Sequence, residues 1–246
     1  MNFLLLEPHE LDAAGRAELR GRRAAHVHGV LRAQIGQRLR AGVLGGSLGH
    51  ATVTALAADR VAVEVAFDEP PPATRDVLLL AVPRPKVLLR LLAHAAAMWF
   101  ARIELFRSWR VEKSHLASTA MRAEVQREQL LLGLEQAGRT RLPTIGFHPL
   151  FKPMVEDALP NLDLPGDRYV AHPTAAVDTA DLAPGHGPFA LAIGPEGGFL
   201  PYEVGALRAA GFLPIRCGAT PLRVETAVAA LWGQLDLLRR RGQRAP

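Results

Sequence analysis

The chain has 246 residues, of which 49% are hydrophobic and 22% charged, a balance typical of a globular protein with room for one large domain or two small ones. Its single cysteine excludes an intramolecular disulfide framework, and no apolar run reaches the roughly 18 residues that a membrane helix requires. The net charge of +5 is uneven, since residues 16–40 carry seven Arg and one Glu whereas residues 142–238 carry five basic and ten acidic side chains. We expect a cytoplasmic protein without a signal peptide or a membrane segment.

The basic blocks point to a polyanionic partner. Residues 84–141 also carry an excess, with eleven basic and five acidic side chains, so two separate regions are positively charged. Nucleic acid is the commonest partner of such regions. The alternative is that a GC-rich genome favours arginine and that these side chains only solvate the surface.

The N-terminal part of the chain is predicted to be β-rich. Residues 51–56 and 60–67 alternate with period two, as half-buried strands do, and the glycines of 42–49 suit turns and bulges. Pro70, Pro71 and Pro72 follow as a stiff spacer that cannot join a central strand. The pattern predicts one domain over residues 1–70 and a second over residues 71–246.

Beyond the spacer, strand and helix patterns alternate, which predicts an α/β architecture. Residues 77–82 are apolar on both faces, as a parallel strand covered on both sides should be. The further expected strands are 103–106, 167–171, 189–193 and 213–217, and the expected helices are 86–100, 121–137, 200–210 and 227–238.

Three of these strand ends carry unusual loops, at residues 171–173, 194–198 and 217–222. Ligands of open α/β sheets gather at the carboxyl ends of the strands. The loop at 194–198 reads Gly-Pro-Glu-Gly-Gly and exposes main-chain groups to close approach, and Arg223 and Glu225 follow the third loop. A ligand pocket with an Arg/Glu pair at its rim is one interpretation. A tight strand-to-helix turn and a structural ion pair form the other.

Several other kinds of site are not indicated. The nine histidines are scattered, and His26 and His28 have no cluster of Cys or carboxylate partners, so no metal site is predicted. The glycine loop lacks the Gly-Lys-Ser/Thr of a P-loop and the spacing of a dinucleotide fingerprint. No Gly-x-Ser-x-Gly elbow or Ser/His/Asp pattern is found.

The loops resemble the three cofactor loops of the SPOUT methyltransferases, in particular of the RsmE family. The resemblance lies in Ala-His-Pro at 171–173, Ile-Gly-Pro-Glu-Gly-Gly at 193–198 and Leu-Arg-Val-Glu-Thr-Ala at 222–227. Glu-Gln-Ala-Gly-Arg-Thr-Arg-Leu-Pro at 135–143 and His-Val-His-Gly-Val-Leu-Arg at 26–32 are also similar to family segments. The likeness touches both ends and the middle of the chain.

The resemblance implies a SPOUT-type parallel sheet with a C-terminal trefoil knot, preceded by a small PUA-like β-barrel that binds RNA. It implies a homodimer that uses S-adenosylmethionine to methylate N3 of a uridine in the 16S ribosomal RNA of the small subunit. The helix at 227–238 is a candidate dimer element, with packing inside the subunit as the alternative.

The resemblance also assigns residues. Arg223 and Glu225 are the candidate catalytic residues, Arg223 to stabilise the uracil oxygen or anchor a phosphate and Glu225 to orient it or accept the N3 proton. The implied cofactor-binding residues are His172, Pro173, Ile193, Gly194, Pro195, Glu196, Gly197, Gly198, Cys217, Gly218 and Leu222. The implied RNA-binding residues are Arg22, Arg23, His26, Arg32 and Arg139.

The chain also departs from the family pattern. Residues 93–99, Ala-His-Ala-Ala-Ala-Met-Trp, stand where the family usually has Gln-Lys-Ala-x-Glu-Leu-Gly, and Ser-Trp-Arg-Val at 108–111 replaces Ser-Glu-Arg-Ser. Thr220 and Val224 replace a usual Arg and Thr. These changes predict retained cofactor binding and leave two alternatives open: a methyltransferase acting on a different RNA site, or a cofactor-binding RNA-binding protein without turnover.

Overall fold

The chain forms two compact units. The computed structural model describes residues 3–71, 73, 75–185 and 187–244. The first unit comprises Met1–Ala73 and Leu131–Leu142, and the second comprises Thr74–Leu130 and Pro143–Pro246. The first unit therefore takes in a middle segment that the expected division at 70/71 assigned to the second domain. Pro72 of the expected spacer lies outside the described residues.

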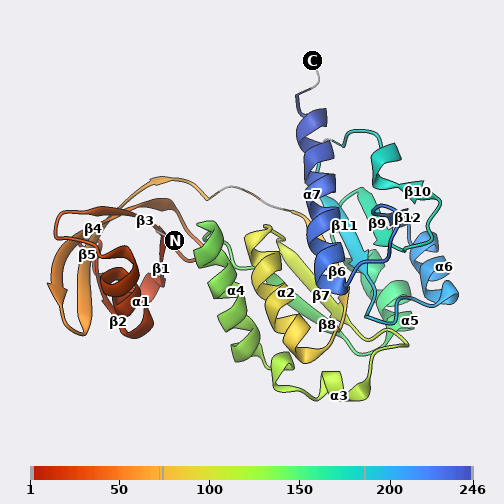
Figure 1. Ribbon diagram of the computed structural model, residues 1–246, viewed down its shortest axis with the longest axis horizontal. Coiled ribbons are helices and arrows are strands. Elements are labelled where there is room, and N and C mark those ends of the chain that lie inside the picture. The colour runs from red at the N-terminus through yellow and green to blue at the C-terminus, as the bar shows by residue number, and fades with distance from the viewer. Residues whose placement is uncertain (1–2, 72, 74, 186, 245–246) are drawn as a thin grey trace. The chain divides into compact units, whose positions relative to one another are not determined.

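The first unit is built on a five-stranded sheet in the order β1-β3-β4-β5-β2, which curls over helix α1 (Figure 1). Neighbouring strands are antiparallel except β1 and β3. The strands are β1 Phe3–Leu6, β2 Arg16–Arg20, β3 Arg38–Val43, β4 Leu48–Ala57 and β5 Arg60–Glu69. The expected β-rich character of the N-terminal part is confirmed, and β1, β2 and β3 are strands in addition to the two that the alternation predicted.

Alternation explains the core of this unit. Val61 and Val63 of β5 are buried on one face, together with Leu19 of β2 and Val53 of β4. The segment α1 Gly21–His26 and π-helix η2 Val27–Leu31 packs on the same face through Ala24 and Val27. Turn η1 spans Pro8–Glu10.

The middle segment is hydrogen-bonded to the strand connection of the same unit. The Thr140 hydroxyl donates to the Gly46 carbonyl over 2.7 Å, and the Gly45 amide donates to the Thr140 carbonyl over 2.7 Å. Thr140 is buried there. These bonds explain why the residues after helix α4 Ala123–Ala137 belong to the first unit, together with the end of that helix from Leu131 onward.

The second unit contains a seven-stranded sheet in the order β10-β12-β9-β11-β6-β7-β8, in which all neighbouring strands are parallel. The strands are β6 Val77–Ala81, β7 Arg102–Phe106, β8 Thr144–His148, β9 Asp167–Ala171, β10 Val177–Asp178, β11 Phe189–Ile193 and β12 Leu213–Arg216. Every residue of β6 and β11 is buried, as continuous apolar strands covered on both faces should be. The α/β prediction is confirmed, and β8 and β10 are additions to it. The trefoil knot remains a prediction.

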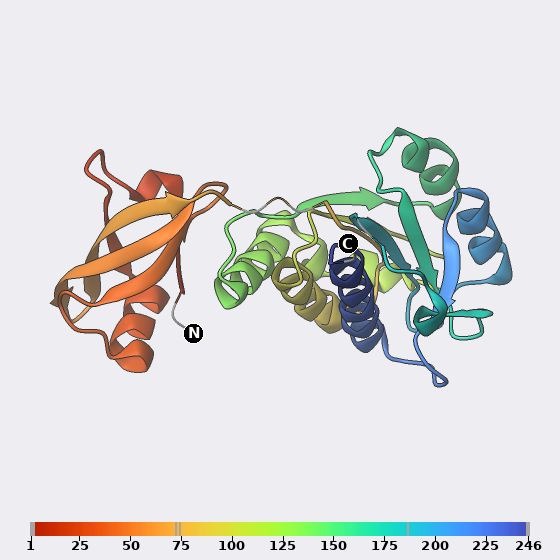
Figure 2. The ribbon, with the colours of Figure 1, turned by 90° about the horizontal axis from the view of Figure 1, so that it is seen from above.

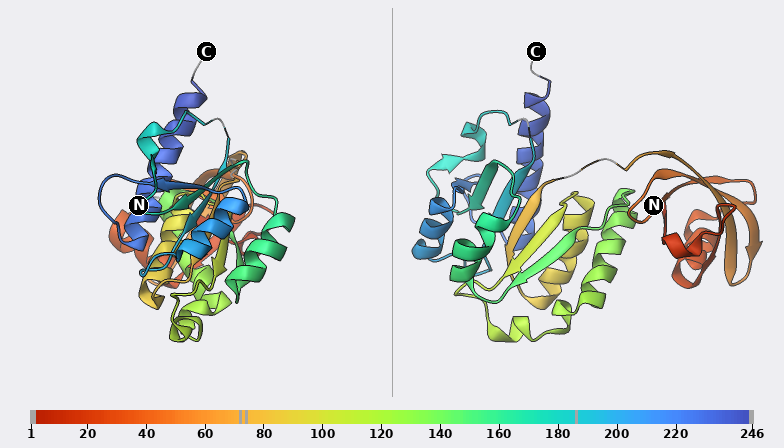
Figure 3. Two further views of the ribbon diagram at one scale, coloured as in Figure 1. Left: turned by 90° about the vertical axis from the view of Figure 1, so that its right-hand side faces the viewer. Right: turned by 180° about the vertical axis from the view of Figure 1, so that it is seen from behind.

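Helices cover both faces of this sheet. Helices α2 and α7 lie on one face, and α5 and α6 lie on the other (Figures 2 and 3). The helices are α2 Pro85–Ala97, α3 Lys113–Leu116, α5 Phe151–Pro153, α6 Pro201–Ala209 and α7 Val224–Gly242, with short turns η3 Thr119–Met121, η4 Met154–Ala158, η5 Leu159–Asn161 and η6 Thr179–Asp181. Helix α7 begins three residues before the expected Ala227, so Glu225 lies in its first turn.

No helix among the described residues is both long and apolar enough to cross a membrane.

A buried ion pair fixes α7 to the sheet. Arg239 donates to both carboxylate oxygens of Asp76, over 2.8 and 2.9 Å, and the Phe189 amide donates to the same carboxylate over 3.1 Å. Asp76 is 1% exposed, and its position just before β6 places this contact at the amino end of the strands. The opposite, carboxyl end is left for the loops.

Candidate active site

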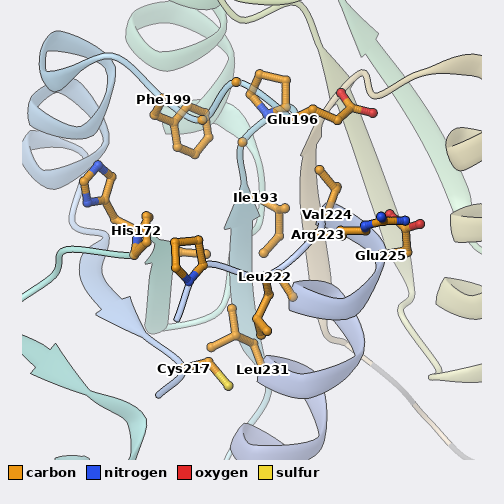
Figure 4. A pocket seen from close by; sticks show the side chains of 18 of the residues that line it. His172, Ile193, Glu196, Phe199, Cys217, Leu222, Arg223, Val224, Glu225 and Leu231 are labelled. Carbon is orange, nitrogen blue, oxygen red and sulfur yellow. The ribbon is translucent and has the colours of Figure 1, made fainter. Parts of the chain in front are cut away.

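The three loops expected from the sequence meet at one cavity. They follow β9, β11 and β12, which are neighbours in the sheet, and the start of α7 closes a further side (Figure 4). The cavity has a volume of about 860 Å³. Its lining includes all the candidate cofactor residues, namely His172, Pro173, Ile193, Gly194, Pro195, Glu196, Gly197, Gly198, Cys217, Gly218 and Leu222.

The loop after β9 is held by main-chain hydrogen bonds. The His172 amide donates to the Ile215 carbonyl of β12 over 2.9 Å, and the Ala175 amide donates to the His172 carbonyl over 3.0 Å. The His172 ring nitrogen Nδ1 lies 3.1 Å from the Thr174 hydroxyl. These contacts fix the imidazole at one wall of the cavity (Figure 4).

The loop after β11 forms a tight turn, in which the Gly198 amide donates to the Pro195 carbonyl over 2.8 Å. Gly198 has φ of +70°, a conformation that residues with a Cβ rarely adopt. Phe199 then turns back into the core and stacks on Phe106 with ring centroids 6.2 Å apart. The Glu196 carboxylate accepts a hydrogen bond from the Arg84 amide over 2.9 Å, which ties this loop to the end of β6.

The loop after β12 is the most open of the three. Residues 218–223 are exposed, and Gly218 again has a positive φ of 77°. Cys217 faces α7, where Gln234 Nε2 lies 3.1 Å from its sulfur. Burial raises the pKa of the Cys217 thiol, so it is a poor nucleophile at neutral pH. The loop therefore offers a ligand main-chain groups and an apolar contact, rather than reactive side chains.

The two candidate catalytic residues lie at the start of α7. Arg223 is the N-cap residue, and its exposed side chain makes no ion pair among the described residues. Glu225 Oε1 lies 3.2 Å from Arg90 Nη2 of α2. Figure 4 shows Arg223 and Glu225 on the side of the cavity opposite His172. The structure therefore pairs Glu225 with Arg90, and not with Arg223 as the ion-pair alternative required.

Arg84, Arg90 and Arg110 line the cavity wall and were missed by the sequence analysis, as was Arg216 of β12. Arg84 follows β6, Arg90 lies on α2 and Arg110 follows β7, where its guanidinium donates to the Gly197 carbonyl. The available signal was positional, because β6 neighbours β11 and the carboxyl ends of parallel strands share one edge. Together with Arg216 and Arg223 they give the cavity a positive rim.

The candidate RNA-binding residues all lie in the first unit. Arg22 donates to both carboxylate oxygens of Glu135 over 2.8 Å, and Arg23 contacts Glu10 and the Leu5 carbonyl. Arg32 has a positive φ of 49° and is exposed. Arg23 is thus engaged inside the unit, whereas Arg32 projects into solvent.

Arg139 and His26 complete this set. Both are partly buried, and burial together with the charge of Arg40 lowers the pKa of the Arg139 guanidinium. The contribution of Arg40 shows that the two guanidinium groups are close enough for their like charges to interact. Among the described residues no group of three or more His, Cys, Asp or Glu is arranged to hold a metal ion.

Comparisons with known proteins identify the family. Residues 70–236 match the model of the RNA methyltransferase domain. The chain is 30% identical over 241 residues to ribosomal RNA small subunit methyltransferase E of Treponema pallidum (strain Nichols), covering 94% of this chain and 88% of that protein.

Solved structures show the same fold. One is a ribosomal RNA small subunit methyltransferase E from Neisseria gonorrhoeae bound to S-adenosylmethionine, with a TM-score of 0.75, 20% identity and coverage of 97% and 98% of the two chains. Another is a protein from Legionella pneumophila in complex with the same cofactor, with a TM-score of 0.69, 22% identity and 98% coverage of each chain. The chain belongs to the RNA methyltransferase family and, within it, to the RsmE group.

Proposed function

We propose that this protein transfers a methyl group from S-adenosylmethionine to N3 of a uridine in 16S ribosomal RNA. The observation that carries the proposal is the single cavity in which three main-chain-lined loops meet Arg223 and Glu225. The family and the names of its relatives supply the substrate class.

The cavity fits the cofactor in size and in chemistry. Pockets for ligands of this size commonly measure about 300–1,000 Å³, and the volume of about 860 Å³ falls within that range. Ile193, Leu222 and Leu231 offer apolar contacts, and the main chain of Gly194, Gly198 and Gly218 offers polar groups that side chains do not block. When bound, S-adenosylmethionine supplies a methyl group made electrophilic by its sulfonium.

The residues at the start of α7 would act on the uridine. The N3 proton of uracil must leave for its nitrogen to become a nucleophile, and a positioned carboxylate such as that of Glu225 can accept it. Negative charge then develops on the uracil oxygens, where the Arg223 guanidinium can stabilise it. Arg90 holds Glu225 from α2 and so acts as a positioning residue.

The remaining arginines suit the RNA backbone. Arg84 and Arg110 at the cavity rim, and Arg32 with Arg139 in the first unit, are placed on surfaces where phosphates can be neutralised. RNA binding should therefore weaken steeply as salt is added, because each neutralised phosphate releases counterions.

We further propose a PUA-like role for the first unit, a knotted third loop, a homodimer and a cytoplasmic location.

The test is to map methylated nucleotides by mass spectrometry in ribosomal RNA from a strain that lacks the gene. The proposal predicts one unmodified uridine in 16S ribosomal RNA, restored when the gene is supplied again. Unchanged 16S methylation with loss of a methyl group elsewhere would instead support a methyltransferase acting on another RNA. Calorimetric titration of the purified protein with S-adenosylmethionine separates both from a protein that does not use the cofactor.

A further inference from the structure

The indole of Trp109 is unused by the fold. It is 80% exposed, more than any other large apolar side chain among the described residues. The residues that flank the exposed pair Trp109 and Arg110 are buried, since Ser108 is 1% and Val111 4% exposed, and the Val111 amide donates to the Ser108 carbonyl over 3.1 Å. The tryptophan therefore stands at the tip of a tight turn that follows β7.

The turn is held in place by a hydrogen bond to a buried carboxylate. Glu203 of α6 is 1% exposed, and its two oxygens accept the Trp109 amide over 2.9 Å and the Leu200 amide over 2.8 Å. An unpaired carboxylate at this depth would be costly, so the two amides are held firmly in place. The fold thus presents the indole on a rigid support, where a flexible loop would let it fold back onto the surface.

This support adjoins the cavity. Arg110, the next residue, lines the cavity and its guanidinium donates to the Gly197 carbonyl. The contact is close, because a Cβ added to Gly197 would lie 3.1 Å from Arg110 Cδ. Trp109 is therefore one residue outside the proposed methyl-transfer site, beside an arginine.

The chemistry of the surroundings favours one occupant. An exposed aromatic ring next to cationic side chains is the arrangement that binds single-stranded nucleic acid, in which bases stack on rings and phosphates contact arginine. Arg110 and Arg84 supply the charge at this rim.

We propose that Trp109 stacks on an unpaired base of the substrate RNA adjacent to the methylated nucleotide and so helps to determine which site is methylated. The inference rests on the proposed function, because it assumes an RNA substrate at this cavity. Trp109 takes no part in the methyl transfer, and it is not among the residues that line the cavity.

The test compares Trp109→Ala and Trp109→Phe with the parent protein on an RNA hairpin that carries the target uridine. Loss of one base–aromatic stack should weaken RNA affinity and raise KM for RNA by about tenfold, with kcat at saturating RNA unchanged. Trp109→Phe should recover most of the affinity. The Kd for S-adenosylmethionine should stay within twofold in both variants, and Phe147→Ala, which removes another exposed aromatic side chain, should have no effect.

Two results would overturn the inference. One is an unchanged Kd and KM for RNA in Trp109→Ala. The other is a change of sedimentation from dimer to monomer in Trp109→Ala, which would make the indole a subunit contact. Failure of the proposed function looks different, because the parent protein itself would then bind no S-adenosylmethionine or methylate no RNA.

Discussion

The Glu225 carboxylate lies 3.2 Å from the Arg90 guanidinium, so the first turn of α7 is tied to α2 at the cavity rim. The pair is partly exposed, and such pairs contribute little to stability, about 0–1 kcal/mol. Its contribution would be to orient the Glu225 carboxylate. Arg90 selects one direction for a carboxylate that otherwise has several rotamers.

Replacing Arg90 with Ala should therefore lower kcat by roughly tenfold, because Glu225 loses its orientation. The melting temperature and the Kd for S-adenosylmethionine should change little. Lys86→Ala, an exposed cation on the same helix, serves as the control. A rise in KM for RNA with kcat unchanged would instead make Arg90 a direct RNA contact.

Replacing Arg223 with Ala should reduce methyl transfer by at least about 100-fold, as expected when a group that stabilises developing charge is removed. Cofactor affinity should stay within a few-fold, since the Arg223 side chain makes no cap hydrogen bond and is exposed. Radiolabelled methyl transfer and calorimetry measure the two quantities. If cofactor binding disappears together with activity, Arg223 belongs to the framework of the third loop.

Replacing Asp76 with Ala should destabilise the second unit by about 3 kcal/mol, because Arg239 and the Phe189 amide lose a buried partner. All three tryptophans lie in this unit, so their fluorescence during urea unfolding reports on it alone. Arg240→Ala, which breaks an exposed pair with Asp236, should cost under about 1 kcal/mol. Equal effects of the two variants would contradict the assigned role of Asp76.

The Glu10–Arg23 contact predicts a pH dependence in the first unit. Burial raises the pKa of Glu10, but hydrogen bonds from Arg23 and from the Glu7 amide outweigh burial and leave this pKa below its ordinary value. A carboxyl whose folded pKa is lowered stabilises the fold above its unfolded pKa of about 4.3, and this contribution is lost as the pH falls through the folded pKa.

Glu10→Gln should therefore increase amide exchange in β1 and α1 at pH 7, and its difference from the parent protein should shrink below about pH 4. Hydrogen exchange with mass spectrometry, run on both proteins at each pH, measures the difference and cancels the intrinsic pH dependence of exchange. A difference that stays constant from pH 7 to pH 3 would show that the Glu10 charge does not contribute.

Sequence patterns predicted the strands that are buried on both faces. Residues 77–81 and 189–193 are continuous apolar runs, and both form strands buried on two faces. Strand β8 was missed because it lies at the sheet edge, where Phe147 is exposed and Gly146 accommodates the Glu104 carboxylate. An edge strand such as β8 pairs with one neighbouring strand only, so its sequence need not alternate or be continuously apolar. Hydrophobic periodicity therefore does not predict it.

The loops of the candidate site could be predicted from the sequence. The side chains that contact these loops from other elements could not. Glycines and the Arg223/Glu225 pattern are local signals, and the cavity includes all of them. The Arg90–Glu225 pair joins residues 135 positions apart, and only the packing of α2 beside α7 brings them together. The same holds for Arg110, whose approach to Gly197 depends on the order of strands in the sheet.

The hydrogen bonds between Thr140 and the turn at Gly45 and Gly46 have a consequence for how this protein can be divided. The chain leaves the first unit, returns to it for residues 131–142 and leaves again, so three covalent crossings join the two units. Proteolysis within the proline spacer would cut one crossing and leave two intact. A gene fragment ending at residue 70 would encode a sheet without its Thr140 contact, so exchange of the small unit between relatives requires two separate pieces of sequence.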